Sequence, residues 1–413
     1  MTTGAFFELE QIWDGPTIPD VALAVRRAAA ELASGLAPGS RVAIACGSRG
    51  ISRIREVIAA VVSALRDAGH APFVVTAMGS HGGATAAGQE ELLATYGITE
   101  AGVGAPIVAG MDVERVGTSP DGVPLFFDKV ALSADAVILV NRVKPHTTLT
   151  GELGSGLMKM LCVGLGNRIG AETMHGWGLQ ANLRPVARAL LEATPVRGGI
   201  ALVENARGEL AHIEPVSAAD VLERERSLLA LARSYLPRIF LDPIDVLVVR
   251  RMGKNISGTG MDPNIIGLHR RHGGPPDRTI STIVALDLSD ESHGNATGVG
   301  MADLVTSRLR DKIDWQTTSM NCLTGKFPAG MRLPFALPSD REALETAFGL
   351  YDAATARAIV VEDTLRLNRI WASESLLEEC EQHGSMRRTS APSPLAFDSD
   401  GKLSSNVIRS EAP

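Results

Sequence analysis

Three stretches in the first half of the chain share one pattern, in which a continuous apolar run ends in a cluster of polar residues. The stretches are RVAIACGSRG (41–50), APFVVTAMGSHGG (71–83) and ADAVILVNRVKPH (134–146). Apolar runs rich in β-branched residues are typical of strands that are buried on both faces. A helical pattern, residues 51–69, lies between the first two and ends on glycine, as helices commonly do. Alternating strands and helices predict a parallel α/β sheet.

The second half repeats this alternation after a break. A further strand at 198–210 and a helix at 218–237 complete the first part, and then Pro237 and Pro243 follow. New apolar runs begin at 244–253, 278–289, 354–363 and 369–384, with a helix expected near 300–312. A chain of 413 residues exceeds the size of roughly 250–300 at which a single core stops growing.

The pattern therefore predicts an α/β protein of two domains. Residues 1–238 are expected to form an N-terminal domain with a mostly parallel, Rossmann-like sheet, and residues 239–390 a smaller C-terminal α/β domain. The Ser- and Pro-rich end, residues 391–413, is expected to be a polar tail. Ligands of such proteins commonly bind between domains, so we expect the active site in the cleft between these two.

Composition excludes several classes of protein. The net charge of −7, with both signs interspersed, provides no basic surface for nucleic acid. The four cysteines are far apart in sequence, which argues against a disulfide framework or a thiolate zinc site. The start, MTTGAFFELEQIW, is acidic where a signal peptide is basic, and no run of about 18 apolar residues suggests a membrane span. We expect a cytoplasmic protein that binds neither nucleic acid nor membrane.

Candidate chemistry lies at the ends of the predicted strands. Arg49, His81 and His146 each follow an apolar run, and the carboxyl ends of parallel strands are where ligands bind in such sheets. Lys159 lies in GSGLMKM (154–160), which lacks the P-loop spacing and the Ser or Thr that binds magnesium. Its apolar setting favours the neutral, nucleophilic amine, although a lysine that reaches solvent from a helix start is an equally good interpretation. His175 follows sixteen residues later.

From these residues alone, several functions are open. His81, His146 and His175 could hold an ordinary divalent metal ion in a hydrolase or lyase. The chain could also be a non-catalytic α/β protein that binds a nucleotide or a carboxylate.

The motifs resemble one known family more specifically. GSHGG (79–83), His146, Lys159 and His175 resemble the nickel-pincer-nucleotide-dependent lactate racemase family. That resemblance implies an isomerase, a racemase or epimerase of a lactate-like or larger 2-hydroxy acid. It also implies a nickel pincer nucleotide, the pyridinium-3-thioamide-5-thiocarboxylic acid mononucleotide with its Ni ion, and partner enzymes that synthesise this cofactor.

The resemblance assigns a role to each residue. Lys159 would hold the cofactor covalently through a thioamide, with Gly154 and Gly156 beside it, and His175 would be the metal ligand. His81 and His146 would be the catalytic acid/base pair on opposite faces of the substrate.

The resemblance also extends to the substrate. Arg49 would hold the substrate, and in the second domain Lys254 or Arg270 would take the place of the family's substrate-binding lysine. Two departures put lactate itself in doubt: Cys46 stands where the family has an acid, and Gly267 stands where it has a glutamine.

The implied chemistry is physically sensible. Removing the carbon-bound proton of a 2-hydroxy acid is difficult because the neighbouring carboxylate is already negative. Moving that hydrogen reversibly as hydride to an electrophilic cofactor avoids the carbanion, and the hydroxyl group then needs a base on each face. Histidines suit this reversible proton transfer near neutral pH.

Overall fold

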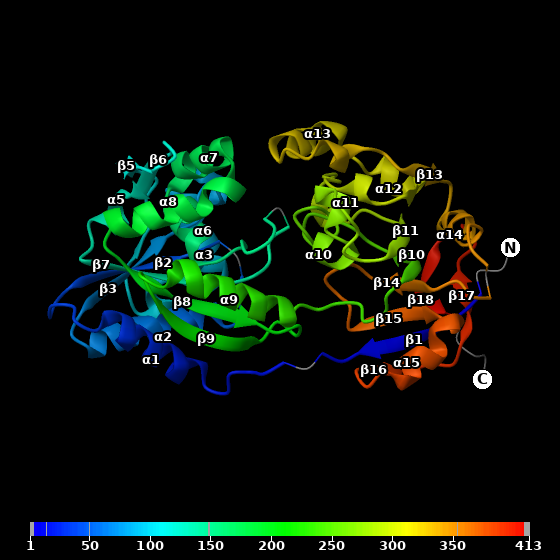
Figure 1. The fold of residues 1–413 in the computed structure, drawn as a ribbon, viewed down its shortest axis with the longest axis horizontal. Helices are drawn as coiled ribbons and strands as arrows, with labels where there is room; N and C mark the ends of the chain where they lie inside the picture. Colours follow the sequence, from blue (N-terminus) through cyan, green and yellow to red (C-terminus); the bar gives the residue numbers. More distant parts are fainter. Residues whose placement is uncertain (1–3, 14, 49, 148, 353, 409–413) are drawn as a thin grey trace. The chain divides into compact units, whose positions relative to one another are not determined.

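A computed structural model of the chain describes residues 4–13, 15–48, 50–147, 149–352 and 354–408 (Figure 1). The chain divides into two compact units. Asp14–Leu236 form one, called the first unit here, and Met1–Trp13 together with Pro237–Pro413 form the second unit. Each unit contains a parallel sheet with helices, so the predicted two-domain α/β fold is confirmed.

The first unit is built around a six-stranded sheet with the order β4-β3-β2-β7-β8-β9. Neighbouring strands are parallel except for the last pair, β8 and β9. Its strands are β2 (Arg41–Cys46), β3 (Ala71–Thr76), β4 (Ile107–Val108), β7 (Ala136–Arg142), β8 (Val196–Glu204) and β9 (Leu210–Ser217). The four strands that the hydrophobic runs predict at 41–50, 71–83, 134–146 and 198–210 are thus present.

Alternate residues of these strands face two separate apolar cores. Val42, Ile44 and Ile138 pack on one face with α1 and α2, whereas Ala43 and Leu139 pack on the other with α6–α9. A separate hairpin of β5 (Val113–Thr118) and β6 (Pro124–Asp128) contributes to the second core. The helices of this unit are α1 (Val21–Ala33), α2 (Ile54–Asp67), η1 (Gly82–Ala84), α3 (Ala86–Thr95), α4 (Glu100–Val103), α5 (Lys129–Leu132), α6 (Leu157–Lys159), the π-helix η2 (Met160–Gly164), α7 (Asn167–Trp177), α8 (Leu179–Ala193) and α9 (Val221–Ser234).

The strand order reverses direction between β2 and β7. From β2 the chain continues to β3 and β4 on one side, and from β7 it continues to β8 and β9 on the other. The register places Cys46, Thr76 and Val140 level with one another at the carboxyl ends of β2, β3 and β7. Such a reversal opens a crevice in which ligands of parallel α/β sheets bind. The loops after these strands contain His81 and His146.

The second unit contains a ten-stranded mixed sheet with the order β13-β12-β11-β10-β14-β15-β1-β17-β18, and β16 also pairs with β1. Strands β10–β14 are mutually parallel, and the strands from β15 onward are antiparallel. The strands are β1 (Ala5–Gln11), β10 (Ile244–Val249), β11 (Ile280–Ala285), β12 (Leu304–Thr306), β13 (Phe335–Leu337), β14 (Ala358–Val361), β15 (Arg369–Ser373), β16 (Met386–Arg388), β17 (Ser393–Phe397) and β18 (Leu403–Ile408).

The helices of the second unit are short. They are α10 (Pro263–Ile266), α11 (His269–His272), η3 (Asp290–Ser292), η4 (Val299–Met301), α12 (Ser307–Asp311), α13 (Trp315–Thr324), η5 (Pro328–Met331), α14 (Asp340–Phe348), η6 (Glu374–Leu376) and α15 (Leu377–Gln382). The single helix expected near 300–312 is wrong, because strand β12 separates η4 from α12.

The predicted domain limits need correction at both ends of the chain. The boundary near 238 agrees with the division after Leu236, but residues 5–11 form β1, which pairs with β15 in the second unit. Residues 393–408 of the expected polar tail form the hairpin β17–β18. Leu395, Leu403 and Val407 of this hairpin are buried in one core with helix α14. Three apolar side chains thus anchor two strands within a polar composition.

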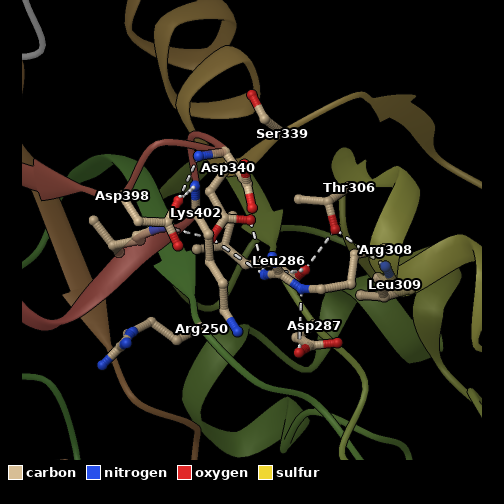
Figure 2. A network of polar contacts seen from close by, with 12 residues as sticks. Arg250, Leu286, Asp287, Thr306, Arg308, Leu309, Ser339, Asp340, Asp398 and Lys402 are labelled. Carbon is tan, nitrogen blue, oxygen red and sulfur yellow. Dashed lines mark hydrogen bonds and ion pairs between the residues drawn. The ribbon is translucent and has the colours of Figure 1, made fainter.

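A network of charged groups fixes this hairpin (Figure 2). The buried Asp340, at the start of α14, accepts a hydrogen bond from the Leu403 backbone N–H at 2.8 Å. It also forms an ion pair with Arg308 at 2.8 Å. In the turn of the hairpin, Asp398 accepts from the Lys402 backbone N–H at 2.9 Å. No helix among the described residues has both the length and the apolar character needed to cross a bilayer.

Candidate active site

The loop after β3, which contains the GSHGG motif, is fastened to the helical segment that follows residue 156. Gly79 N–H donates to the Gly164 carbonyl at 3.0 Å, and Gly79 has φ of 62°. A Cβ at Gly79 would lie 3.1 Å from the Val163 carbonyl oxygen, in a backbone conformation that side chains disfavour. Glycine is therefore needed here to bring the two loops together. This contact brings the His81 loop and the Lys159 segment to the same edge of the sheet.

His81 is exposed and is held by its neighbours. Its Nδ1 atom forms a short hydrogen bond with the Ser48 hydroxyl, in the loop after β2. The Tyr96 hydroxyl donates to the Ser48 carbonyl at 2.9 Å, and Gln89 Nε2 donates to the Gly79 carbonyl at 3.0 Å. Because Nδ1 is engaged with Ser48, Nε2 is the ring nitrogen of His81 that is suited to exchange a proton with a ligand.

Lys159 lies on a helical segment with irregular hydrogen bonding. It ends α6 and is followed at once by the π-helix η2. Single turns of π-helix are rare and are frequently found at functional sites. Asn141, at the carboxyl end of β7, donates from Nδ2 to the Gly156 carbonyl at 2.7 Å and so ties the start of this segment to the sheet.

The structure brings Lys159 and His146 together. Lys159 Nζ lies 2.8 Å from His146 Nε2, and both side chains are half-buried. A hydrogen bond between two such nitrogens needs one N–H donor and one lone pair, so one of the two groups must be neutral at the shared position. Two positive charges at this separation would also repel each other. The contact therefore requires that at least one of the two nitrogens carries a lone pair.

A buried acid, Glu225 of α9, holds the start of the Lys159 segment. Its Oε2 accepts from the Met158 N–H at 2.9 Å, and burial raises its pKa to about 7. A Cβ at Gly156 would lie 2.5 Å from the Glu225 Cδ, and a Cβ at Gly154 would lie 2.6 Å from Leu229 Cδ1. The space beside both predicted cofactor-binding glycines is thus filled by α9.

His175 lies on α7 and is exposed. The helix begins at Asn167, a buried residue with φ of 49°, whose Nδ2 donates to Asp128 Oδ2 at 2.8 Å. Burial raises the pKa of Asp128, although hydrogen bonds from the Ala131 backbone and from Asn167 oppose this. These contacts fix the direction of α7, and the role of His175 as metal ligand stays a prediction.

The predicted substrate residues have different outcomes. Arg49 lies outside the described residues. Arg270 donates to the carbonyls of Met301 and Ile280, each at 2.9 Å, and pairs with Asp303 at 3.0 Å. Its guanidinium therefore links α11 to β11 and to the segment around η4.

Lys254, the other candidate for the place of the substrate-binding lysine, is also engaged in hydrogen bonds. Lys254 Nζ donates to the Gly258 carbonyl at 2.9 Å and to Asn321 Oδ1 at 3.1 Å. Burial raises the pKa of Cys46 to about 12, so the residue in place of the family's acid is a neutral thiol at physiological pH.

The described side chains contain no group of three or more His, Cys, Asp or Glu residues arranged to hold a metal ion. The ordinary divalent-metal site that His81, His146 and His175 could form therefore finds no support in the geometry. Reasoning from sequence also missed Ser48, Tyr96, Asn141 and Glu225. Ser48 follows a predicted strand and Asn141 lies at the end of one, so both could have been found by their place. Tyr96, directly after α3, has no local signal, whereas the helical period places Glu225 on the apolar face of α9.

Comparisons with known proteins agree with this architecture. Residues 49–239, which are nearly all in the first unit, match a family model described as a domain of unknown function, DUF362. The structure of the lactate racemase apoprotein from Thermoanaerobacterium thermosaccharolyticum is similar, with a TM-score of 0.55 and 12% sequence identity. This similarity covers 87% of this chain and 99% of that chain.

A crystal structure of a Thermotoga maritima protein also matches, with a TM-score of 0.48, 14% identity, and coverage of 66% of this chain and 72% of that one. No curated protein matches the chain by sequence. At these identities the comparisons define the fold, which is lactate-racemase-like with two α/β units. They also place the Lys159–His146 pair within the segment that matches the family model.

Proposed function

We propose that this protein is a racemase or epimerase of a 2-hydroxy acid that holds a nickel pincer nucleotide on Lys159. The observation that carries the proposal is the Lys159 Nζ atom, which lies 2.8 Å from His146 Nε2. Lys159 is the last residue of α6, directly before the π-helix η2, at the reversal of strand order. The similarity to the lactate racemase fold supports it.

The residues present fit this cofactor in two respects. Lys159 provides an amine beside a group that can accept its proton, which a covalent amide-type bond requires. The pincer group needs one protein nitrogen on nickel, which His175 would supply, so a cluster of protein ligands is unnecessary. When bound, the cofactor would supply the reversible acceptor of hydride, leaving a keto acid as the transient product.

The histidines would move the hydroxyl proton. His81, with Nδ1 held by Ser48, presents Nε2 as one base, and His146 would be the other, on the Lys159 side. Each enantiomer of the substrate would use its own histidine when its hydroxyl proton leaves. Arg49, and Lys254 or Arg270, would bind the carboxylate, and both Lys254 and Arg270 would have to exchange hydrogen bonds of the second unit to do so.

The experiment combines mass and stereochemistry. The full chain is co-expressed with cofactor-synthesising enzymes, and the adduct is mapped by intact and peptide mass spectrometry together with nickel analysis. A panel of chiral 2-hydroxy acids deuterated at C2 is then assayed for loss of optical rotation. We expect an adduct on Lys159, one nickel per chain, and inversion with deuterium retained at C2. An unmodified Lys159, or inversion with complete exchange of the deuterium into solvent, would refute the proposal.

A further inference from the structure

Glu225 is an unusual residue in the first unit because it is an acid with almost no access to water. Its residue exposure is 2%, on helix α9. One carboxyl oxygen, Oε2, accepts from the Met158 N–H at 2.9 Å. The other, Oε1, has no hydrogen-bond partner within the described part of the chain. Burying a carboxyl group with half of its capacity unused costs stability, so its presence calls for an explanation.

The position of Glu225 indicates what it does. Helix α6 begins after Gly156, which has no side chain to cap the first backbone N–H groups. Such groups need an acceptor, which a residue just before the helix usually provides. Here the acceptor comes from 67 residues later in the sequence. Met158 is the direct neighbour of Lys159, so the carboxyl group holds the turn from which the Lys159 side chain leaves.

The contact leaves no freedom at Gly156. A Cβ at this position would lie 2.5 Å from Cδ, 2.6 Å from Oε1 and 2.7 Å from Oε2 of Glu225, so any larger residue would displace the turn or the acid. On the other side, Asn141 Nδ2 holds the Gly156 carbonyl at 2.7 Å. The start of the Lys159 segment is therefore held from β7 and from α9 at once.

We infer that Glu225 is a positioning residue for Lys159. Its carboxyl group fixes the first turn of α6 so that Nζ stays in contact with His146 Nε2. That this contact prepares the lysine for a cofactor rests on the proposed function, whereas the positioning itself does not. The exposed side of α9 shows the contrast, since Glu223 two residues earlier pairs with Arg184 near solvent and does not hold this turn.

The test measures the Lys159–His146 contact directly, in the full chain without cofactor. The imidazole resonance of His146 is followed against pH by NMR in the wild type and in four variants. Lys159→Met is the reference for loss of the contact, Glu225→Ala removes the anchor, Glu225→Gln keeps an oxygen that can accept from Met158, and Glu223→Gln is the matched control. A role limited to general stability would leave the His146 titration midpoint unchanged.

We expect Lys159→Met to shift the His146 midpoint and Glu225→Ala to shift it at least halfway to the Lys159→Met value. Glu225→Gln and Glu223→Gln should both stay close to the wild type. If Glu225→Ala leaves the midpoint at the wild-type value, or if Lys159→Met does not move it, the inference is wrong. Where Glu225→Ala does not fold, Glu225→Asp, which draws the carboxyl back by one methylene, replaces it with the same expectation.

A second variant pair approaches the same contact from the other side. Gly156→Ala should shift the His146 midpoint because its new methyl group meets the Glu225 carboxyl. The shift that this substitution adds should be smaller in a Glu225→Ala background, where space has been made, and an equal shift in both backgrounds would oppose the inference. Cofactor loading, measured by intact mass, then separates the two proposals. If Glu225→Ala loses the Lys159–His146 contact while even the wild type takes up no cofactor, the role of Glu225 is upheld and the proposed function is refuted.

Discussion

The two units end their parallel sheets in different kinds of polar cluster. At the carboxyl edge of the first sheet, His81 pairs with the Ser48 hydroxyl, and His146 pairs with Lys159. At the same edge of the second sheet the groups are acids and bases joined as ion pairs (Figure 2). Those pairs are Arg250–Glu362, Arg251–Glu362, Arg308–Asp287, Arg308–Asp340, Lys312–Asp287 and Lys312–Asp290.

The two edges differ in the groups that their polar side chains contact. In the second unit each positive group of these six pairs has a carboxylate within 4 Å, and Asp340 also accepts from the Leu403 N–H of the hairpin, so the charges of these pairs are balanced within the protein. In the first unit a nitrogen is hydrogen-bonded to a nitrogen, a contact that one proton holds together and that two positive charges would weaken. Similar parallel strands thus end in ion pairs in one unit and in contacts of histidine with serine and lysine in the other.

The largest effect that tests this comparison is expected at Lys159. Lys159→Met should abolish covalent loading and racemase activity, because no other amine occupies this turn. The melting temperature should change little, since the lysine is half-buried and outside the apolar cores. Intact mass and polarimetry measure the two losses, and Lys129→Met, on an exposed face of the same unit, is the control. If the Lys159→Met variant still carried the covalent cofactor in full, Lys159 would not be the attachment site and the predicted difference between the two edges would be wrong.

The next effect is on stability and belongs to the second unit. Asp340→Ala removes the acid that holds both Arg308 and the Leu403 N–H, and loss of one partner of a buried pair typically costs about 3–5 kcal/mol. The unfolding midpoint in denaturant, read from tryptophan fluorescence, should fall accordingly. Asp311→Ala, which removes an exposed partner of Arg310, should change stability by less than about 1 kcal/mol. Equal midpoints for Asp340→Ala and the wild type would mean that the second edge is not a structural lock.

Much of this contrast was visible in the sequence, but not all of it. Four buried strands and the polar ends of three of them follow from continuous apolar runs, so the place of His81 and His146 could be predicted. The hairpin β17–β18 could not, because DSDGKLSSNVI is polar and each strand buries only one face. Its signals in the sequence were few: the apolar residues Leu395, Leu403 and Val407, which pack in one core, and the Asp400-Gly401 pair, whose glycine has φ of 75° in the turn.

The residues that position the site were harder to predict. Glu225 lies in a helical segment, VLERERSLL, where its direct neighbours in sequence are charged but the helical period places it between Leu222 and Leu228 on the apolar face. The packing of α9 on α6 shows what this glutamate contacts, and that it is buried while Glu223 and Arg224 are exposed. The glycines at 154 and 156 suggested room for a ligand, whereas the structure fills that room with α9. Contacts between distant segments therefore decide the meaning of residues that local patterns leave open.

Glu225 also provides a test that depends on pH. Burial raises its pKa from 4.5 to about 7, and Cys162 nearby has its pKa raised well above the usual value by burial and by Glu225, so that thiol stays neutral throughout. Between pH 4.5 and about 7, Glu225 keeps a proton in the folded state that it has lost in the unfolded chain. The free energy of unfolding therefore falls by roughly 3 kcal/mol as the pH rises from about 4.5 to about 7. The contribution of Glu225 is constant below and above this range.

Glu225→Gln lacks this titration. Its melting temperature relative to the wild type should rise by several degrees from pH 4.5 to pH 7 and then level off, as calorimetry over this range would measure. Removing the charge of a buried acid would then stabilise the first unit at neutral pH, whereas the Asp340 variant is destabilised. A difference between Glu225→Gln and the wild type that does not vary with pH would show that Glu225 ionises normally.

The smallest expected effect concerns Ser48, which sharpens the distinction between the two histidines. Ser48→Ala removes one hydrogen bond to His81 Nδ1, and a bond worth about 1 kcal/mol corresponds to a loss of about fivefold in rate. In single-turnover experiments the loss should fall on the enantiomer whose hydroxyl proton His81 accepts, because His146 is held separately by Lys159. Ser80→Ala, an exposed neighbour of His81, should leave both directions unchanged. Equal losses from both enantiomers would mean that Ser48 supports the loop as a whole and that His81 and His146 do not divide the two faces of the substrate.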